Sequence, residues 1–114
     1  MANEKRVTLS TAQLTAVSRL FAVLSEPSRL LLLQAMHDGP LTVTELVEAT
    51  EMKQANVSKH LAVLHTHHLV KRERDGISIR YEIADPMIFS LCNLVCSKMQ
   101  RDLKKAAAVF SPEI

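Results

Sequence analysis

The chain has 114 residues, of which 47% are hydrophobic and 23% charged, and this composition is typical of one globular domain and argues against a disordered chain. With two glycines it has no Gly-rich phosphate-binding loop, and with 4% aromatic residues and no Trp it is poorly suited to stacking on single-stranded nucleic acid. The formal net charge of +2 is too small to identify a partner by itself.

The N-terminal third of the chain predicts two helices. Residues 1–10 are mostly polar and are expected to form a flexible N-terminus, and Ser10 with Gln13 forms a capping-box pattern at the start of a helix over 11–24. Pro27 is well placed to open a second helix, which ends near residue 37. This second helix is apolar around most of its circumference, so we expect it at the centre of the core.

Two short helices joined by a turn follow. Thr42 and Glu45 form a second capping box before a helix over 43–50, and an apolar face recurs at helical spacing over 54–67. The short stretch between them has no apolar repeat and is interpreted as a turn. This arrangement is the helix-turn-helix pattern.

The periodicity then changes to that of strands. Residues 69–74 and 78–83 alternate between apolar and polar side chains, and Asp75-Gly76 between them is typical of a hairpin turn. Asp85-Pro86 predicts the start of a last helix that ends at about residue 108. The order α-α-α-α-β-β-α predicts a mainly α (α+β) winged helix-turn-helix domain over 11–108, with a C-terminal tail over 109–114.

The last helix is longer than the core of so small a domain requires. Its apolar stripe from Ile88 to Leu103 would stay exposed on a monomer, together with part of the first helix. We therefore expect a homodimer that forms through the first and last helices.

Basic residues concentrate in the helix-turn-helix and hairpin. Between Lys53 and Tyr81 there are six Lys or Arg residues and two acidic residues. A winged helix places its second short helix in the major groove of double-stranded DNA and its hairpin, or wing, along the backbone or minor groove. The alternative is a protein-interaction module without DNA binding, in which these charges form a solvated face. An enzyme is disfavoured because no Ser-His-Asp or His-Cys constellation can be assembled.

Three stretches resemble the ArsR/SmtB family of bacterial winged-helix repressors: LFAVLSEPSRL at 20–30, QANVSKHLAVL at 54–64 and GISIRY at 76–81. The resemblance covers about residues 17–100. It implies a transcriptional repressor that binds an imperfect palindrome in an operator as a homodimer and is released by an inducer.

The DNA contacts are expected from the polar side chains of 54–60 and from the arginines of the hairpin. Gln and Asn can pair with adenine, and Lys and Arg with guanine or phosphate. The candidate DNA-binding residues are Gln54, Asn56, Ser58, Lys59, His60, Arg72, Arg74 and Arg80.

Some of these residues have a structural alternative. Ser58 and His60 match residues that the family uses, but Ser58 could instead pack against the preceding helix and His60 could be a partly buried imidazole. One of the three arginines could pair with Glu73 or Asp75 instead of meeting DNA.

The metal and redox sites implied by the resemblance are absent. The helix over 43–50 has no Cys, Met87 replaces the His that would follow Asp85, and Gln34 replaces the Cys of a redox pair. A cluster of His65, His67 and His68 is not expected to bind metal, because these residues do not share one helical face. We expect no cofactor at the common family sites.

Cys92 and Cys96 remain as sensor candidates. At i and i+4 their Cβ atoms lie ~5–6 Å apart, which is too far for an unstrained disulfide but suits two thiolates on one soft ion such as arsenite. Thiol oxidation, a persulfide or a disulfide between subunits is an alternative. Both cysteines could also be small apolar residues of a buried stripe, in a regulator with no thiol or metal sensing.

The compartment is inferred from the absence of signals. The stretch MANEKRVTLSTAQ lacks the apolar core of a signal peptide, and the aliphatic run Leu30–Leu33 is too short to span a bilayer. We therefore expect a cytoplasmic protein with reduced thiols and no membrane partner.

Overall fold

The computed structural model describes residues 6–110. Residues 1–5 and 111–114, which belong to the expected flexible N-terminus and C-terminal tail, lie outside this range. The elements in chain order are α1 (Thr11–Leu24), α2 (Pro27–Ala35), β1 (Leu41–Thr42), α3 (Val43–Thr50), α4 (Gln54–Thr66), β2 (Val70–Asp75), β3 (Ser78–Ile83) and α5 (Pro86–Phe110). The predicted order is confirmed, with one additional short strand.

Local hydrogen bonds at the helix starts explain why these boundaries could be predicted. Both capping boxes are present, with Ser10 and Thr42 each exchanging hydrogen bonds of 2.9 and 3.2 Å with the residue three positions on. The C-terminal ends deviate from prediction. α2 ends at Ala35 instead of near residue 37, and α5 continues to Phe110, into the segment expected to be a tail.

The sheet is antiparallel with strand order β1-β3-β2. The register pairs Val70 with Ile83 and Asp75 with Ser78, so the two-residue turn of the hairpin is Gly76-Ile77 and not Asp75-Gly76. Gly76 has φ +65°, a left-handed conformation that Gly adopts without strain. β1 was missed because two residues carry no alternating pattern; its pairing with β3 joins the hairpin to the start of α3.

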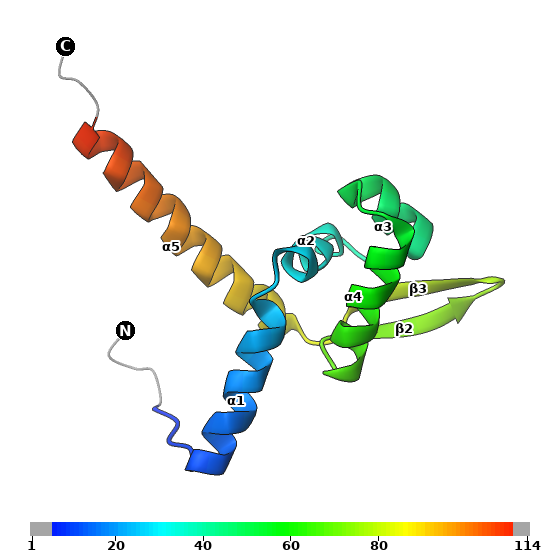
Figure 1. The fold of residues 1–114 in the computed structure, drawn as a ribbon, viewed down its shortest axis with the longest axis horizontal. Helices are drawn as coiled ribbons and strands as arrows, with labels where there is room; N and C mark the ends of the chain where they lie inside the picture. Colours follow the sequence, from blue (N-terminus) through cyan, green and yellow to red (C-terminus); the bar gives the residue numbers. More distant parts are fainter. Residues whose placement is uncertain (1–5, 111–114) are drawn as a thin grey trace.

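The core lies among α2, α3 and α4 and the base of the hairpin. Six side chains are fully buried: Leu32, Met36, Leu46, Val57, Leu61 and Leu64. The central position of α2 is confirmed by the burial of Leu32, Leu33 and the C-cap residue Met36, although Leu30 and Leu31 are partly exposed. The hairpin extends from this core as a wing, so the domain is a winged helix-turn-helix (Figure 1).

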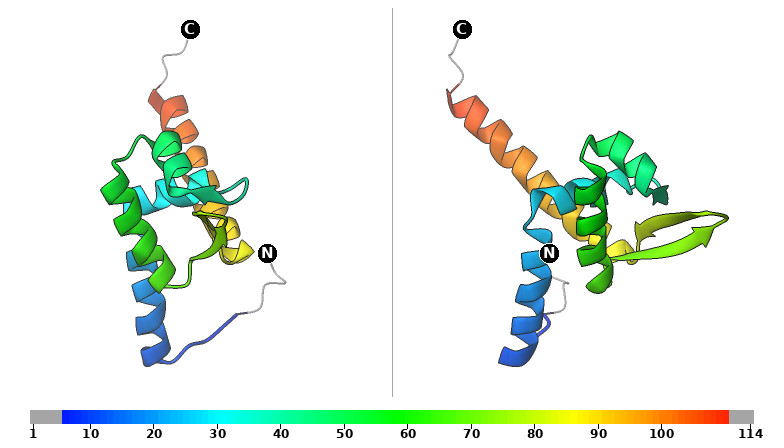
Figure 2. Two further views of the ribbon diagram at one scale, coloured as in Figure 1. Left: turned by 90° about the vertical axis from the view of Figure 1, so that its right-hand side faces the viewer. Right: turned by 45° about the vertical axis from the view of Figure 1, so that its right-hand side comes forward.

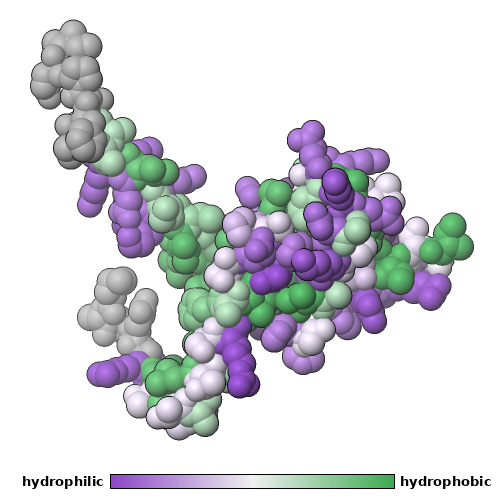
Figure 3. All heavy atoms as spheres, in the orientation of Figure 1, coloured by the Kyte–Doolittle hydropathy of each residue, from purple (hydrophilic) through white to green (hydrophobic). Residues whose placement is uncertain are grey.

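Two helices leave this core with apolar surface uncovered. α5 projects away on the side opposite to the hairpin, and α1 leaves in another direction (Figures 1 and 2). Their large exposed apolar residues are Leu14, Phe21, Met87, Leu94, Val95, Met99 and Leu103, and hydrophobic side chains follow both helices in Figure 3. Among residues 6–110 no helix combines the length and the apolar character needed to cross a membrane.

Candidate DNA-binding interface

The exposed face of α4 carries a row of polar side chains. Val57, Leu61 and Leu64 point into the core, as predicted, and this leaves Gln54, Asn56, Ser58 and Lys59 exposed. Ser58 is exposed and so does not pack against the preceding helix, which was the alternative for this residue. The row lies in the N-terminal half of the helix, which is the part that contacts base edges in helix-turn-helix proteins.

The start of α4 offers backbone donors as well. Lys53 is the N-cap residue, and its side chain makes no capping hydrogen bond. The first N–H groups of a helix have no partner within the helix, and together with the helix dipole they favour a phosphate oxygen. A sequence pattern could have indicated this site through the lack of Ser, Thr, Asp or Asn at position 53.

His60 does not belong to the exposed row. Its exposed fraction is 8%, and its Nδ1 lies 3.2 Å from Nη1 of Arg29 in α2. The structure thus gives His60 the buried alternative and not a DNA contact, because the residue lies one turn from Val57 on the inward face. Its burial does not support the predicted DNA contact of His60.

The tautomer and charge of His60 follow from this partner. Arg can only donate, so Nδ1 must accept and the ring proton resides on Nε2. Burial lowers the pKa of His60 below its ordinary value, and the charges of Arg29 and Lys59 lower it further, against an opposing effect of Glu26. His60 is neutral at neutral pH.

The three arginines of the wing fall on two faces of the hairpin. Arg72 and Arg74 follow Val70 at every second position of β2 and so share its face, and Val70 is buried in the core beside α4. They extend the face of the hairpin that turns toward α4. Neither guanidinium has an ion-pair partner within the part of the chain that the structure describes.

Arg80 is on the opposite face and is held by two carboxylates. Its Nε donates to Oδ2 of Asp75 at 2.9 Å, and its Nη1 donates to Oε1 of Glu45 at 3.2 Å. The pairing with Asp75 was one of the alternatives left open by the sequence; the contact with α3 was not foreseen. Arg80 thus joins the wing to α3 instead of presenting a free charge to phosphate.

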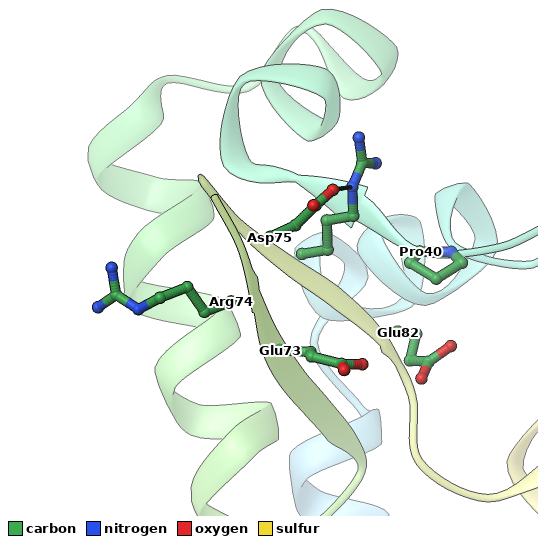
Figure 4. A pocket seen from close by; sticks show the side chains of 6 residues that line it. Pro40, Glu73, Arg74, Asp75 and Glu82 are labelled. Carbon is green, nitrogen blue, oxygen red and sulfur yellow. Dashed lines mark hydrogen bonds and ion pairs between the residues drawn. The ribbon is translucent and has the colours of Figure 1, made fainter. Parts of the chain in front are cut away.

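The face that holds Arg80 also carries three carboxylates, and its other cation, Lys71, pairs with one of them, Glu82. Glu73, Asp75 and Glu82 line a pocket there with Pro40, while the Arg74 side chain points to the other side of the hairpin (Figure 4). Since carboxylates repel phosphate, this face is unsuited to DNA. The face of Arg72 and Arg74 is the only one of the two with free cationic groups among the described residues.

The two cysteines lie away from this surface, along a groove of about 590 Å³ between α2 and α5. Cys92 is half-buried and Cys96 exposed. Burial, and then the neighbouring Cys96, raises the pKa of the Cys92 thiol. Residues 6–110 contain no group of three or more His, Cys, Asp or Glu side chains that could hold a metal ion. His65, His67 and His68 therefore do not form such a group either.

A helix-turn-helix with an exposed polar recognition helix, followed by a wing with free arginines, defines the class of the protein as a winged helix-turn-helix DNA-binding domain. Residues 26–72 match the family model described as "Bacterial regulatory protein, arsR family". The chain is 37% identical over 89 residues to the HTH-type transcriptional regulator NmtR of Mycobacterium tuberculosis, with 78% of this chain and 74% of that protein covered.

Solved structures agree. The chain is similar to the crystal structure of the AntR antimony-specific transcriptional repressor, with a TM-score of 0.77 and 31% identity over 90% of this chain and 94% of that one. It is also similar to the homodimeric winged helix-turn-helix domain of Mb0332 from Mycobacterium bovis, a possible ArsR-family regulator, with a TM-score of 0.76 and 27% identity over 88% and 95%.

The chain belongs to the ArsR/SmtB family. It is a transcriptional repressor of this type with a helix-turn-helix DNA-binding fold. Its relatives are transcriptional regulators and not enzymes, which confirms the prediction that this protein is not an enzyme.

Proposed function

We propose that the protein binds an inverted repeat in operator DNA as a homodimer. α4 lies in the major groove, where Gln54, Asn56, Ser58 and Lys59 meet base edges and phosphates. Arg72 and Arg74 of the wing meet the backbone or the minor groove. The observation that carries this proposal is the exposed polar row on α4 together with the free arginine face of β2, the strand that packs on α4.

Dimerisation follows from the apolar surface of α1 and α5. At 1.5 Å per residue the 25 residues of α5 extend about 37 Å, well beyond the domain's own core. A second copy packed on α1 and α5 would bury this surface and place two copies of α4 about one turn of DNA apart. The homodimeric state of the similar Mb0332 domain supports this arrangement.

Operator binding can be tested even though the target sequence is unidentified. Duplexes that carry a random central region are enriched on the purified protein, and the selected sequences are aligned. We expect an inverted repeat with half-sites about 10 base pairs apart from centre to centre. Enrichment of no sequence, or of an unpaired half-site, would contradict binding as a homodimer and would favour an interaction module.

For the signal that releases DNA, we propose the thiols of Cys92 and Cys96. Both line one groove on one face of α5, and two thiolates at this spacing suit a soft ion such as arsenite. The similar AntR is described as antimony-specific, which supports a thiophilic ion of this group. Oxidation or persulfide formation at the same thiols is the second route, and it assumes the cytoplasmic, reducing location proposed for the protein.

A further inference from the structure

Three elements meet at one partly buried hydrogen-bonded group behind the recognition helix. Arg29, in the first turn of α2, donates from Nε to the backbone oxygen of Val23 at 2.6 Å. The same guanidinium reaches Nδ1 of His60 in α4 at 3.2 Å. Val23 belongs to the last turn of α1, where carbonyl groups have no partner within the helix. One side chain therefore connects the end of α1 with the middle of α4.

The geometry of the Arg29 guanidinium restricts how α1 and α4 can be oriented. A guanidinium presents donors in a rigid planar fork, so the two bonds of Arg29 fix both α1 and α4 relative to its plane. On α4 the held residue, His60, directly follows Ser58 and Lys59 of the exposed polar row. On α1 the carbonyl that accepts this bond belongs to Val23, in the last turn of the helix. The same helix carries part of the apolar surface proposed for the dimer.

We propose that Arg29 and His60 form a positioning bridge that sets the angle of each recognition helix to the dimer axis and so makes the protein selective for the spacing of the two half-sites. The inference rests on the proposed operator binding by a homodimer. Neither residue touches DNA; both act through the orientation of α4.

The charged groups around the bridge make it sensitive to acid. Arg29 of α2 and Lys59 of α4 are cationic, and Glu26, which faces both Arg29 and His60, has its carboxylate bonded to the backbone N–H of Ser28. Protonation of His60 would remove the acceptor at Nδ1 and place two cations in contact. Because the pKa of His60 is lowered, the bridge stays intact through the ordinary His value of about 6.5 and is lost as the pH falls further, through the lowered pKa.

The experiment compares spacing preference in four proteins on the duplex selected by the wild type and on the same duplex with one base pair inserted between the half-sites. His60→Asn keeps an acceptor in the place of Nδ1, and His60→Leu keeps volume but no acceptor. Arg29→Lys keeps the charge but loses the fork. Melting curves establish that each variant is folded, and affinity is measured at neutral pH and at about pH 5.

We expect the wild type and His60→Asn to prefer the original spacing by about tenfold or more, the order of effect of one wrong base pair. His60→Leu and Arg29→Lys should lose most of this preference. At acid pH the wild type should lose it too, while His60→Asn, which retains every other His, should keep it. A purely structural role for His60 would not produce this difference in pH dependence.

Two results would overturn the proposal. A folded His60→Leu with the wild-type spacing preference would do so, and if that variant does not fold, identical pH profiles of the wild type and His60→Asn would do so. Both results leave operator binding standing. A wild type that selects no inverted repeat would instead refute the proposed function and the bridge with it.

Discussion

Arg74 and Arg80 lie on opposite faces of one hairpin, and of the two only Arg80 has a carboxylate partner among residues 6–110. Two arginines that the sequence presents as equivalent thus differ in role. Arg74 has a free charge on the face that continues from Val70, next to α4, whereas Arg80 uses its charge to hold Asp75 and Glu45. The difference leads to a direct comparison of the two residues.

Arg74→Ala and Arg80→Ala should weaken DNA binding in different ways. The loss of one phosphate contact lowers the slope of log affinity against log salt by roughly 1, and Arg74→Ala should show this on operator and random duplexes alike. Arg80→Ala should leave the slope near its wild-type value and lower affinity only by loosening the wing. Titrations at several salt concentrations measure both, and equal slopes for Arg74→Ala and the wild type would refute the assignment of the wing face.

Base reading is predicted for the exposed row of α4. Gln54→Ala and Lys59→Ala should each cost about 1–3 kcal/mol on the selected operator and much less on random DNA, since a lost base contact affects only the matching sequence. Lys71→Ala is the matched control, because Lys71 is also exposed but pairs with Glu82. Equal losses on both duplexes would mean that the two residues touch only phosphate.

Assembly can be tested on residues whose change leaves the monomer intact. Met99 and Leu103 are exposed on α5, so Met99→Asp and Leu103→Asp should not disturb the core but should place charge in the proposed interface. We expect a dimer for the wild type and a monomer for the variants in sedimentation at micromolar concentration. Ile77→Asp, at the fully exposed tip of the wing, should remain dimeric. A monomeric wild type would remove the basis for a palindromic operator.

Features that depend on residues close together in the chain could be predicted from the sequence, and features that depend on distant residues could not. The capping boxes, the strand alternation and the inward face of α4 each depend on residues a few positions apart, so their patterns are visible in the chain. The α3 partner of Arg80, Glu45, is 35 positions away and the partner of His60, Arg29, is 31 positions away, and no local pattern reports either contact. For this reason the candidate DNA residues included one buried imidazole and one arginine already engaged in ion pairs.

The last prediction concerns the two thiols. Because burial raises the pKa of Cys92, this residue has less thiolate at neutral pH than a free thiol, and exposed Cys96 should react first with iodoacetamide. Labelling of Cys92 should become appreciable only as the pH rises above the range of an ordinary thiol. Mass spectrometry of the peptides from timed reactions gives both rates. Faster labelling of Cys92 at neutral pH would contradict the order derived from burial.

The same thiols decide whether the protein senses a thiophilic signal. Arsenite, an oxidant or a persulfide donor should release the wild type from its operator, and the double variant Cys92→Ser, Cys96→Ser should bind DNA normally and respond to none of them. Melting must first establish that the double variant is folded, because a hydroxyl at half-buried position 92 costs stability. A folded double variant that is still released would show that Cys92 and Cys96 pack as small apolar residues and that the signal enters elsewhere, and a wild type that ignores all three compounds would refute thiol sensing altogether.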